Sequence, residues 1–234
     1  MIELTGEDLE LDRAPTRAVR IIDIVEHPRR AGRYLLTLSD ERTFTLSVSL
    51  LANLGVTRKG TELDAQTVRK LENETEVLGV MDRAIASLSR GRRTRRELEQ
   101  RLRRVRPGVL PPAVAVVAIA LDRLTETGLI SDEAVARAEA SSRLRRGDAP
   151  KRVEMILQRK GIERRAAADA VSEAVAEDAI DVDAQCVAVA AKRMRSLAKL
   201  ETKVARRRLM AFLMRRGYGF SSIQLAVTEL FASR

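Results

Sequence analysis

Arginines and lysines gathered in three clusters are the side chains of this chain with the clearest capacity for chemistry. The candidates for contact with a partner are Arg92, Arg93, Arg95, Arg96, Arg143, Arg145, Arg146, Lys151, Arg152, Lys199, Lys203, Arg206, Arg207 and Arg208. Guanidinium and ammonium groups attract and hydrogen-bond to phosphate and carboxylate groups, so these residues offer binding of an acidic surface. For any single arginine, an ordinary solvated helix face is the alternative interpretation.

Residue types needed for catalysis are scarce. The chain has one histidine, His27, next to Pro28 in an expected turn, and one cysteine, Cys186, in an Ala/Val-rich stretch typical of a buried helix. A disulfide framework or a Cys/His metal site needs several such residues. The turn at Lys59-Gly60-Thr61 lacks the upstream glycine of a phosphate-binding loop. We therefore expect a binding protein with no catalytic residue, no metal and no cofactor.

Charge and composition point to a helical protein with an acidic partner. The net charge is +10, and only 3% of the residues are aromatic, so the core must be built from Ala, Val, Leu and Ile. Residues 1–75 carry a net charge of −2 and residues 76–234 one of +12, counted on the same sequence. The acidic first thirteen residues do not look like a secretory signal, and the longest apolar run, 109–121, is too short to span a bilayer. We expect a cytoplasmic protein.

The N-terminal part is predicted to hold a small sheet. Residues 18–25 favour a strand, and 32–38 and 43–47 alternate in a way that favours a hairpin closed by a polar turn. A short helical turn is expected at 49–54, and Asp64 is expected to cap a linking helix.

The rest of the chain is predicted to be helical and to repeat. Segments 97–102, 152–157 and 208–213 resemble one another, and their first residues are 55 and 56 positions apart. The second and third copies end in a basic turn followed by Gly161 or Gly217, which is typical of a helix C-terminus. In the first copy, Pro107-Gly108-Val109 is interpreted as serving the same purpose. Thr94-x-x-Glu97 and Ser221-x-x-Gln224 have the spacing of capping boxes.

These patterns predict a mainly α fold: a tandem array of three three-helix, helix-turn-helix-like repeats forming an elongated curved body, preceded by a small β-hairpin or sheet domain. The expected parts are a flexible acidic leader (1–15), a β-rich domain (16–64), a linking helix (65–79) and helical repeats at 80–130, 131–182 and 183–234.

The order of these features resembles the RecX family, the bacterial regulators of the RecA recombinase. The resemblance covers nearly the whole chain and rests on the motifs Arg92-Arg-Thr-Arg-Arg-Glu-Leu-Glu-Gln-Arg-Leu102, Gly128-Leu-Ile-Ser-Asp132, Arg143-Leu-Arg-Arg-Gly147, Pro150-Lys-Arg-Val153 and Arg159-Lys-Gly-Ile162. The sequence departs from the family in the second repeat, where an aromatic residue and a tryptophan are usual and Val135 and Glu139 stand here.

The resemblance implies a partner of the RecA filament on single-stranded DNA. Such a protein inhibits the recombinase, ATPase and coprotease activities of the filament. A monomer is the simplest interpretation of an array with free ends. A sequence-tolerant protein that binds single- or double-stranded DNA directly is the alternative, although sparse aromatic residues disfavour recognition of single strands by base stacking. A third alternative is a magnesium-dependent nuclease that uses acidic loops such as Asp181/Asp183.

Overall fold

The structure is a computed structural model that describes residues 19–105, 108 and 110–232. The expected acidic leader, 1–15, lies outside the described residues. The chain divides into two compact units, Met1–Val80 and Met81–Arg234.

A four-stranded antiparallel sheet forms the first unit. Its strands are β1 (Val19–Glu26), β2 (Arg33–Leu38), β3 (Thr43–Ser47) and β4 (Glu62–Leu63), in the order β3-β2-β1-β4. The predicted first strand and hairpin are confirmed, and Thr37 lies opposite Thr43 beside the hairpin turn. The two-residue strand β4 was not predicted, because so short a segment has no alternating pattern.

Alternation in the strands directs one set of side chains into the core of this unit. Leu36 and Leu38 of β2 are buried with Phe44 and Leu46 of β3. The short helix α1 (Val48–Asn53) adds Leu51 to this core, and the Ser47 side chain caps it by accepting a hydrogen bond from the Leu50 N–H at 3.3 Å.

Helix α2 (Ala65–Leu88) is continuous across residues 79 and 80, where the linking helix was predicted to end and the first repeat to begin. Asp64 caps it as predicted, accepting a hydrogen bond from the Thr67 N–H at 2.6 Å. Gly79 does not break the helix. A glycine inside a helix costs only about 1 kcal/mol relative to alanine, and the flanking Leu78 and Val80 are both buried, so burial of the flanking turns offsets this cost.

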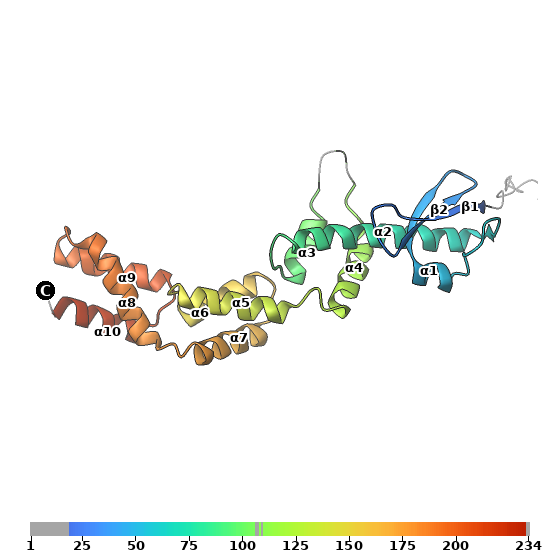
Figure 1. Cartoon of the computed structure of the whole chain (residues 1–234). Coiled ribbons are helices and arrows are strands. Elements are labelled where there is room, and N and C mark those ends of the chain that lie inside the picture. The colour runs from blue at the N-terminus through green and yellow to red at the C-terminus, as the bar shows by residue number, and fades with distance from the viewer. Residues whose placement is uncertain (1–18, 106–107, 109, 233–234) are drawn as a thin grey trace, which may run out of the picture. The chain divides into compact units, whose positions relative to one another are not determined.

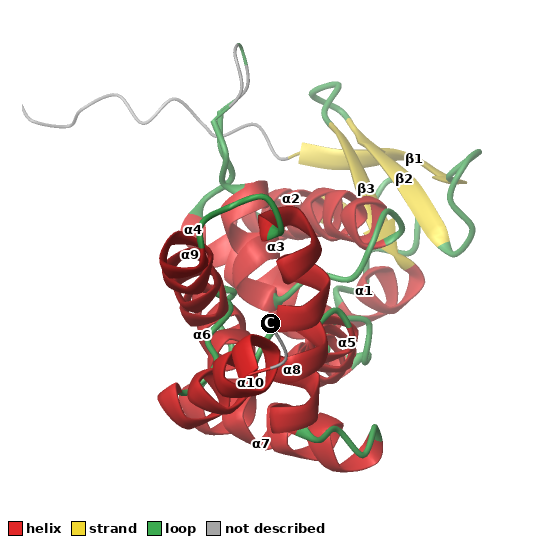
Figure 2. Ribbon diagram, turned by 90° about the vertical axis from the view of Figure 1, so that its left-hand side faces the viewer, coloured by secondary structure: helices red, strands yellow, loops and turns green. Residues whose placement is uncertain are grey.

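The second unit holds the remaining helices (Figure 1). They are α3 (Arg95–Leu102), α4 (Val114–Glu126), α5 (Asp132–Arg145), α6 (Pro150–Arg159), α7 (Arg164–Glu177), α8 (Val182–Met194), the 3-10 helix η1 (Arg195–Leu197), α9 (Thr202–Arg215) and α10 (Phe220–Ala232). Figure 2 shows the strands in yellow, all of them within the first unit. The prediction of a mainly helical chain with a small N-terminal sheet is confirmed.

The three similar segments fall in α3, α6 and α9, and each buries a pair of side chains one helical turn apart. The pairs are Leu98/Leu102, Val153/Leu157 and Leu209/Leu213. Gly161 and Gly217, with φ of 94° and 83°, end α6 and α9 in the predicted left-handed conformation.

Two predicted helix ends were wrong. Helix α3 ends at Leu102, and its C-cap is Arg103, whose N–H donates the last helical hydrogen bond to the Glu99 carbonyl at 3.0 Å. Gly108 therefore does not cap this helix. Pro107 and Val109 lie outside the described residues. Ser221 is not a cap either. Helix α10 already begins at Phe220, and the Ile223 N–H donates to the Gly219 carbonyl at 3.0 Å.

Candidate partner-binding surface

The N-terminus of α3 meets the C-terminus of α6. Thr94 caps α3 in the predicted capping box, in which its hydroxyl oxygen accepts the Glu97 N–H and the Glu97 carboxylate accepts the Thr94 N–H. The same hydroxyl donates to the carbonyl oxygen of Lys160, the C-cap of α6, at 2.7 Å. One fully buried side chain thus satisfies backbone groups at two helix ends.

A second junction of the same kind joins α6 to α9. The N–H of Ala149, the N-cap of α6, donates to the carbonyl oxygen of Arg216, the C-cap of α9, at 3.0 Å. Arg152 adds a side-chain hydrogen bond to the Arg215 carbonyl. In both junctions a partly negative helix C-terminus faces a partly positive N-terminus, which is a favourable arrangement of helix dipoles.

Glycine permits close approach at both junctions. A Cβ atom on Gly161 would lie 2.6 Å from the Arg96 Cδ, and one on Gly217 would lie 2.6 Å from the Arg152 Cβ and 3.1 Å from its backbone nitrogen. The basic residues at the start of α3 and α6 therefore pack directly against the end of the following middle helix. A side chain larger than hydrogen at Gly161 or Gly217 would therefore force these helix ends apart.

Several of the predicted contact residues have partners within the chain. Arg95 pairs with Asp122 at 2.8 Å, Arg145 with Asp178 at 2.8 Å, and Arg146 hydrogen-bonds to Ser142. Arg143 pairs with Glu139 at 2.5 Å, and Arg152 with Asp148 at 3.6 Å. These five arginines form ion pairs or hydrogen bonds within the second unit. They are therefore weaker candidates for contact with an external partner than the sequence alone indicated.

Two carboxylates that the sequence analysis missed organise these cations. Asp148 lies within 3.4 Å of Arg143 and 3.6 Å of both Arg152 and Arg216. Glu139 pairs with Arg143 and, at 3.3 Å, with Lys160. Burial raises the pKa of Glu139, but the hydrogen bond from Arg143 and the charges of Lys160 and Arg143 outweigh it and lower that pKa below its ordinary value. The spacing of Glu139 and Arg143, one helical turn apart, was the available signal.

The other predicted residues have no ion pair and no side-chain hydrogen bond within the described part of the chain. They are Arg92, Arg93, Arg96, Lys151, Lys199, Lys203, Arg206, Arg207 and Arg208. Of these, Arg93 is only partly exposed and its Nε atom is buried without a hydrogen-bond partner. Among the described residues, no hydrogen bond or ion pair joins the three clusters to one another through these nine side chains.

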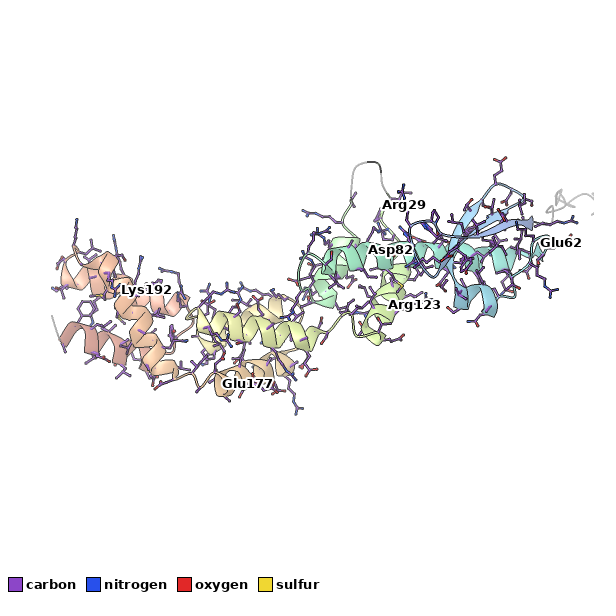
Figure 3. All side chains as sticks on the ribbon, in the orientation of Figure 1. Arg29, Glu62, Asp82, Arg123, Glu177 and Lys192 are labelled. Atoms are coloured by element: carbon purple, nitrogen blue, oxygen red, sulfur yellow. The ribbon has the colours of Figure 1, made fainter. Side chains whose placement is uncertain are left out.

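Among these unpaired candidates, the largest group lies on α9. We define the α9 basic surface as Lys203, Arg206, Arg207 and Arg208, all exposed. Helix α9 itself contains no acidic residue, and its opposite side is held in the core by Ala205, Leu209 and Leu213. Cations that form no ion pair within the chain leave a positive potential that an acidic partner can neutralise. Lys192, labelled in Figure 3, is a further exposed cation at the C-terminal end of α8.

The expected burial of Cys186 is confirmed. Its side chain lies in the core formed by α8, α9 and α10, where burial, aided by the charge of Asp183, raises the pKa of the thiol to about 11. Such a thiol is a poor nucleophile at neutral pH. Within the described residues, neither a group of metal-ligating side chains nor a helix long and apolar enough to cross a membrane was found.

Comparison with known proteins gives one consistent family. The model of the third three-helix domain of RecX matches residues 181–227, which begin at Asp181, the N-cap of α8, and end within α10. The chain is 34% identical over 150 residues to the regulatory protein RecX of Halorhodospira halophila, a match that covers 63% of this chain and 85% of the relative.

Other relatives extend the match over most of the chain. The regulatory protein RecX of Bacillus subtilis is 26% identical over 212 residues, covering 90% of this chain and 76% of the relative. A crystal structure of regulatory protein RecX superposes with a TM-score of 0.71 at 22% identity, covering 89% of this chain and 98% of that one. At this identity the structural match shows the shared fold.

Proposed function

The chain belongs to the RecX family, and on that premise we propose that it regulates a bacterial RecA recombinase by binding the filament that the recombinase forms on single-stranded DNA. Binding would inhibit the recombinase, ATPase and coprotease activities, and so restrain homologous recombination and the SOS response. The proposed protein is a cytoplasmic monomer that acts by binding, without catalysis. The domain boundaries predicted from the sequence, three helical repeats at 80–130, 131–182 and 183–234, belong to this proposal.

The α9 basic surface is the observation that carries the proposal. A filament of protein on DNA offers both carboxylates and phosphates, and four exposed cations with no internal partner among the described residues suit either group. The junctions between α3, α6 and α9 support an extended interface. Each junction holds the start of one middle helix against the end of the next, so the three helices follow one another in a fixed order. Several weak contacts on one scaffold can give a high overall affinity, because the first contact raises the effective concentration for the others.

Direct binding to DNA is the second candidate function. The same α9 basic surface favours it, since cations that lack carboxylate partners neutralise backbone phosphates regardless of sequence. Binding of this kind releases counterions and weakens steeply as salt rises. The two candidates therefore differ in whether assembled filament is required.

The test compares binding to filament and to bare DNA. A fluorescent single-stranded oligonucleotide is presented either alone or coated with RecA held in a slowly hydrolysed nucleotide state, at two salt concentrations. Preferential binding to the coated strand at the higher salt supports filament regulation. Equal binding to both, with a steep loss at the higher salt, supports direct DNA binding and contradicts the first proposal.

A further inference from the structure

A small pocket between α8 and the end of α9 gathers four cations. Its volume is about 320 Å³, and its lining includes Arg146, Lys192, Arg193 and Arg216 together with Phe212. No carboxylate belongs to this lining. None of the four residues of the α9 basic surface belongs to this lining.

The corresponding position of the second repeat is occupied by a carboxylate, as an alignment of the two repeats shows. Ser131 and Asp181 cap the first helices of the two repeats, and the buried Ala140 and Ala190 follow at the same fifty-residue offset. The same offset pairs Glu139 with Val189. It also pairs Arg143 with Arg193, and the C-caps of the middle helices pair Lys160 with Arg216.

This pairing exposes a difference of charge. In the second repeat Glu139 binds Arg143 at 2.5 Å and Lys160 at 3.3 Å, so the carboxylate neutralises both cations internally. In the third repeat the position of Glu139 is taken by Val189, which cannot do so.

The cations of the third repeat consequently have fewer carboxylate partners than those of the second. Arg193 and Lys192 have no carboxylate partner in the described part of the chain. Arg216 approaches Asp148 at 3.6 Å, but that single carboxylate is shared with Arg143 and Arg152.

Phe212 holds two of these cations in place. The guanidinium of Arg193 lies 5.2 Å from the centre of its ring, and that of Arg216 lies 5.4 Å from it. Cation–π contact fixes the position of a guanidinium while leaving its N–H donors available. Arg216 is fixed further by hydrogen bonds to the carbonyl oxygens of Arg146 and Gly147 at 3.0 and 3.1 Å. The site is thus organised before any ligand arrives.

We propose that this pocket binds a phosphate group, which takes the place that Glu139 occupies in the second repeat. Several cations around a small volume suit a compact oxyanion with a high charge, and guanidinium groups match phosphate oxygens in pairs. The phosphate comes either from a small phosphorylated molecule or from the backbone of a nucleic-acid strand. The inference rests on the pocket and the repeat comparison, independently of any role with the recombinase.

The decisive variant restores the internal carboxylate. Val189→Glu places in the third repeat the residue that the second repeat carries, and inorganic phosphate is titrated at constant ionic strength while amide chemical shifts of the full chain are followed. Lys192→Gln removes one cation from the pocket. Lys70→Gln is its matched control, since Lys70 is also exposed and forms no ion pair with the described residues, but it does not line the pocket.

We expect saturable chemical-shift changes around Arg193 and Arg216 in the unaltered protein. In Val189→Glu the affinity for phosphate should be lower by about tenfold or more, because the new carboxylate occupies a charge-assisted contact that phosphate would otherwise make. Lys192→Gln should weaken phosphate binding severalfold and Lys70→Gln should not. A short oligonucleotide without terminal phosphate that displaces phosphate identifies the strand backbone as the source, and its failure to compete identifies a small molecule. The proposal is overturned if the unaltered protein shows no saturable binding, or if folded Val189→Glu and Lys192→Gln both bind phosphate as the unaltered protein does.

Discussion

The hydroxyl of Thr94 reaches across 66 positions of sequence to the carbonyl oxygen of Lys160, at 2.7 Å. Thr94 begins α3 and Lys160 ends α6, so this bond joins the middle helices of two repeats. Ala149 and Arg216 stand in the same relation between α6 and α9. The protein therefore connects its repeats mainly through helix ends, and those ends are where its stability can be tested.

Replacement of Thr94 by valine should lower the free energy of unfolding by about 1 to 3 kcal/mol, because it removes a helix cap and leaves the part-buried Lys160 carbonyl without this donor. Chemical denaturation measures this change. Thr94→Ser keeps the hydroxyl and should recover most of the loss. Equal stability of the valine variant and the unaltered protein would show that the junction contributes nothing.

Gly217→Ala should be more destabilising than Gly128→Ala. Both glycines have positive φ, at 83° and 73°, so both substitutions cost about 1 to 2 kcal/mol in backbone strain. Only at Gly217 does the added Cβ also collide, at 2.6 Å from the Arg152 Cβ, whereas Gly128 faces open space. The collision adds about 1 to 3 kcal/mol. Thermal or denaturant unfolding of the two variants side by side would refute this account if their losses were the same.

Glu139 should make stability fall on the acid side. Its pKa in the folded protein lies below the ordinary 4.5, so the unfolded chain takes up the proton first as pH drops. The contribution of this carboxylate is therefore fully present above about pH 4.5 and is lost as pH falls through the lowered folded pKa.

Glu139→Gln should accordingly destabilise the protein by about 1 kcal/mol at pH 7, and it should flatten the dependence of unfolding free energy on pH below 5. Unfolding curves at several pH values measure both effects. A parallel shift of the whole pH profile, with its slope unchanged, would show that Glu139 stays unpaired in solution.

Cys186 should react slowly with thiol reagents in the native protein. Burial raises its pKa to about 11, against an ordinary value of 9.0, which lowers the thiolate fraction at pH 8 by about a hundredfold. The fully buried sulfur must also become exposed before it reacts. Labelling should therefore speed up sharply in denaturant. Rapid labelling of the folded protein, at the rate of a free thiol, would place Cys186 at the surface.

Sequence patterns predicted the elements of this fold well where a periodic apolar face existed. The hairpin of β2 and β3 and the buried pairs Leu98/Leu102 and Leu209/Leu213 follow from such patterns. The boundary predicted between the linking helix and the first repeat, at 79/80, has no counterpart in the secondary structure: α2 continues through Gly79, whose neighbours Leu78 and Val80 are both buried.

The predicted contact residues were harder to rank from sequence. Arg143 and Arg207 look alike in a list of basic residues, yet Arg143 is paired with Glu139 and Asp148 whereas Arg207 has no partner in the described residues. Asp148 reaches cations from α6 and from the end of α9, and contacts between separate repeats leave no periodic signal. Spacing therefore predicted where cations gather but could not distinguish structural cations from free ones.

The single-stranded-DNA-dependent ATPase of RecA, titrated with this protein, tests the central claim most directly. The triple variant Lys203→Glu, Arg207→Glu and Arg208→Glu reverses most of the α9 basic surface, and its folding is checked by circular dichroism. We predict inhibition at less than one molecule per recombinase protomer for the unaltered protein, and inhibition weakened by about tenfold or more in the variant, as expected when several charge contacts are lost. An ATPase unaffected by the unaltered protein would contradict filament regulation, and equal inhibition by the folded variant would contradict the α9 basic surface as its interface.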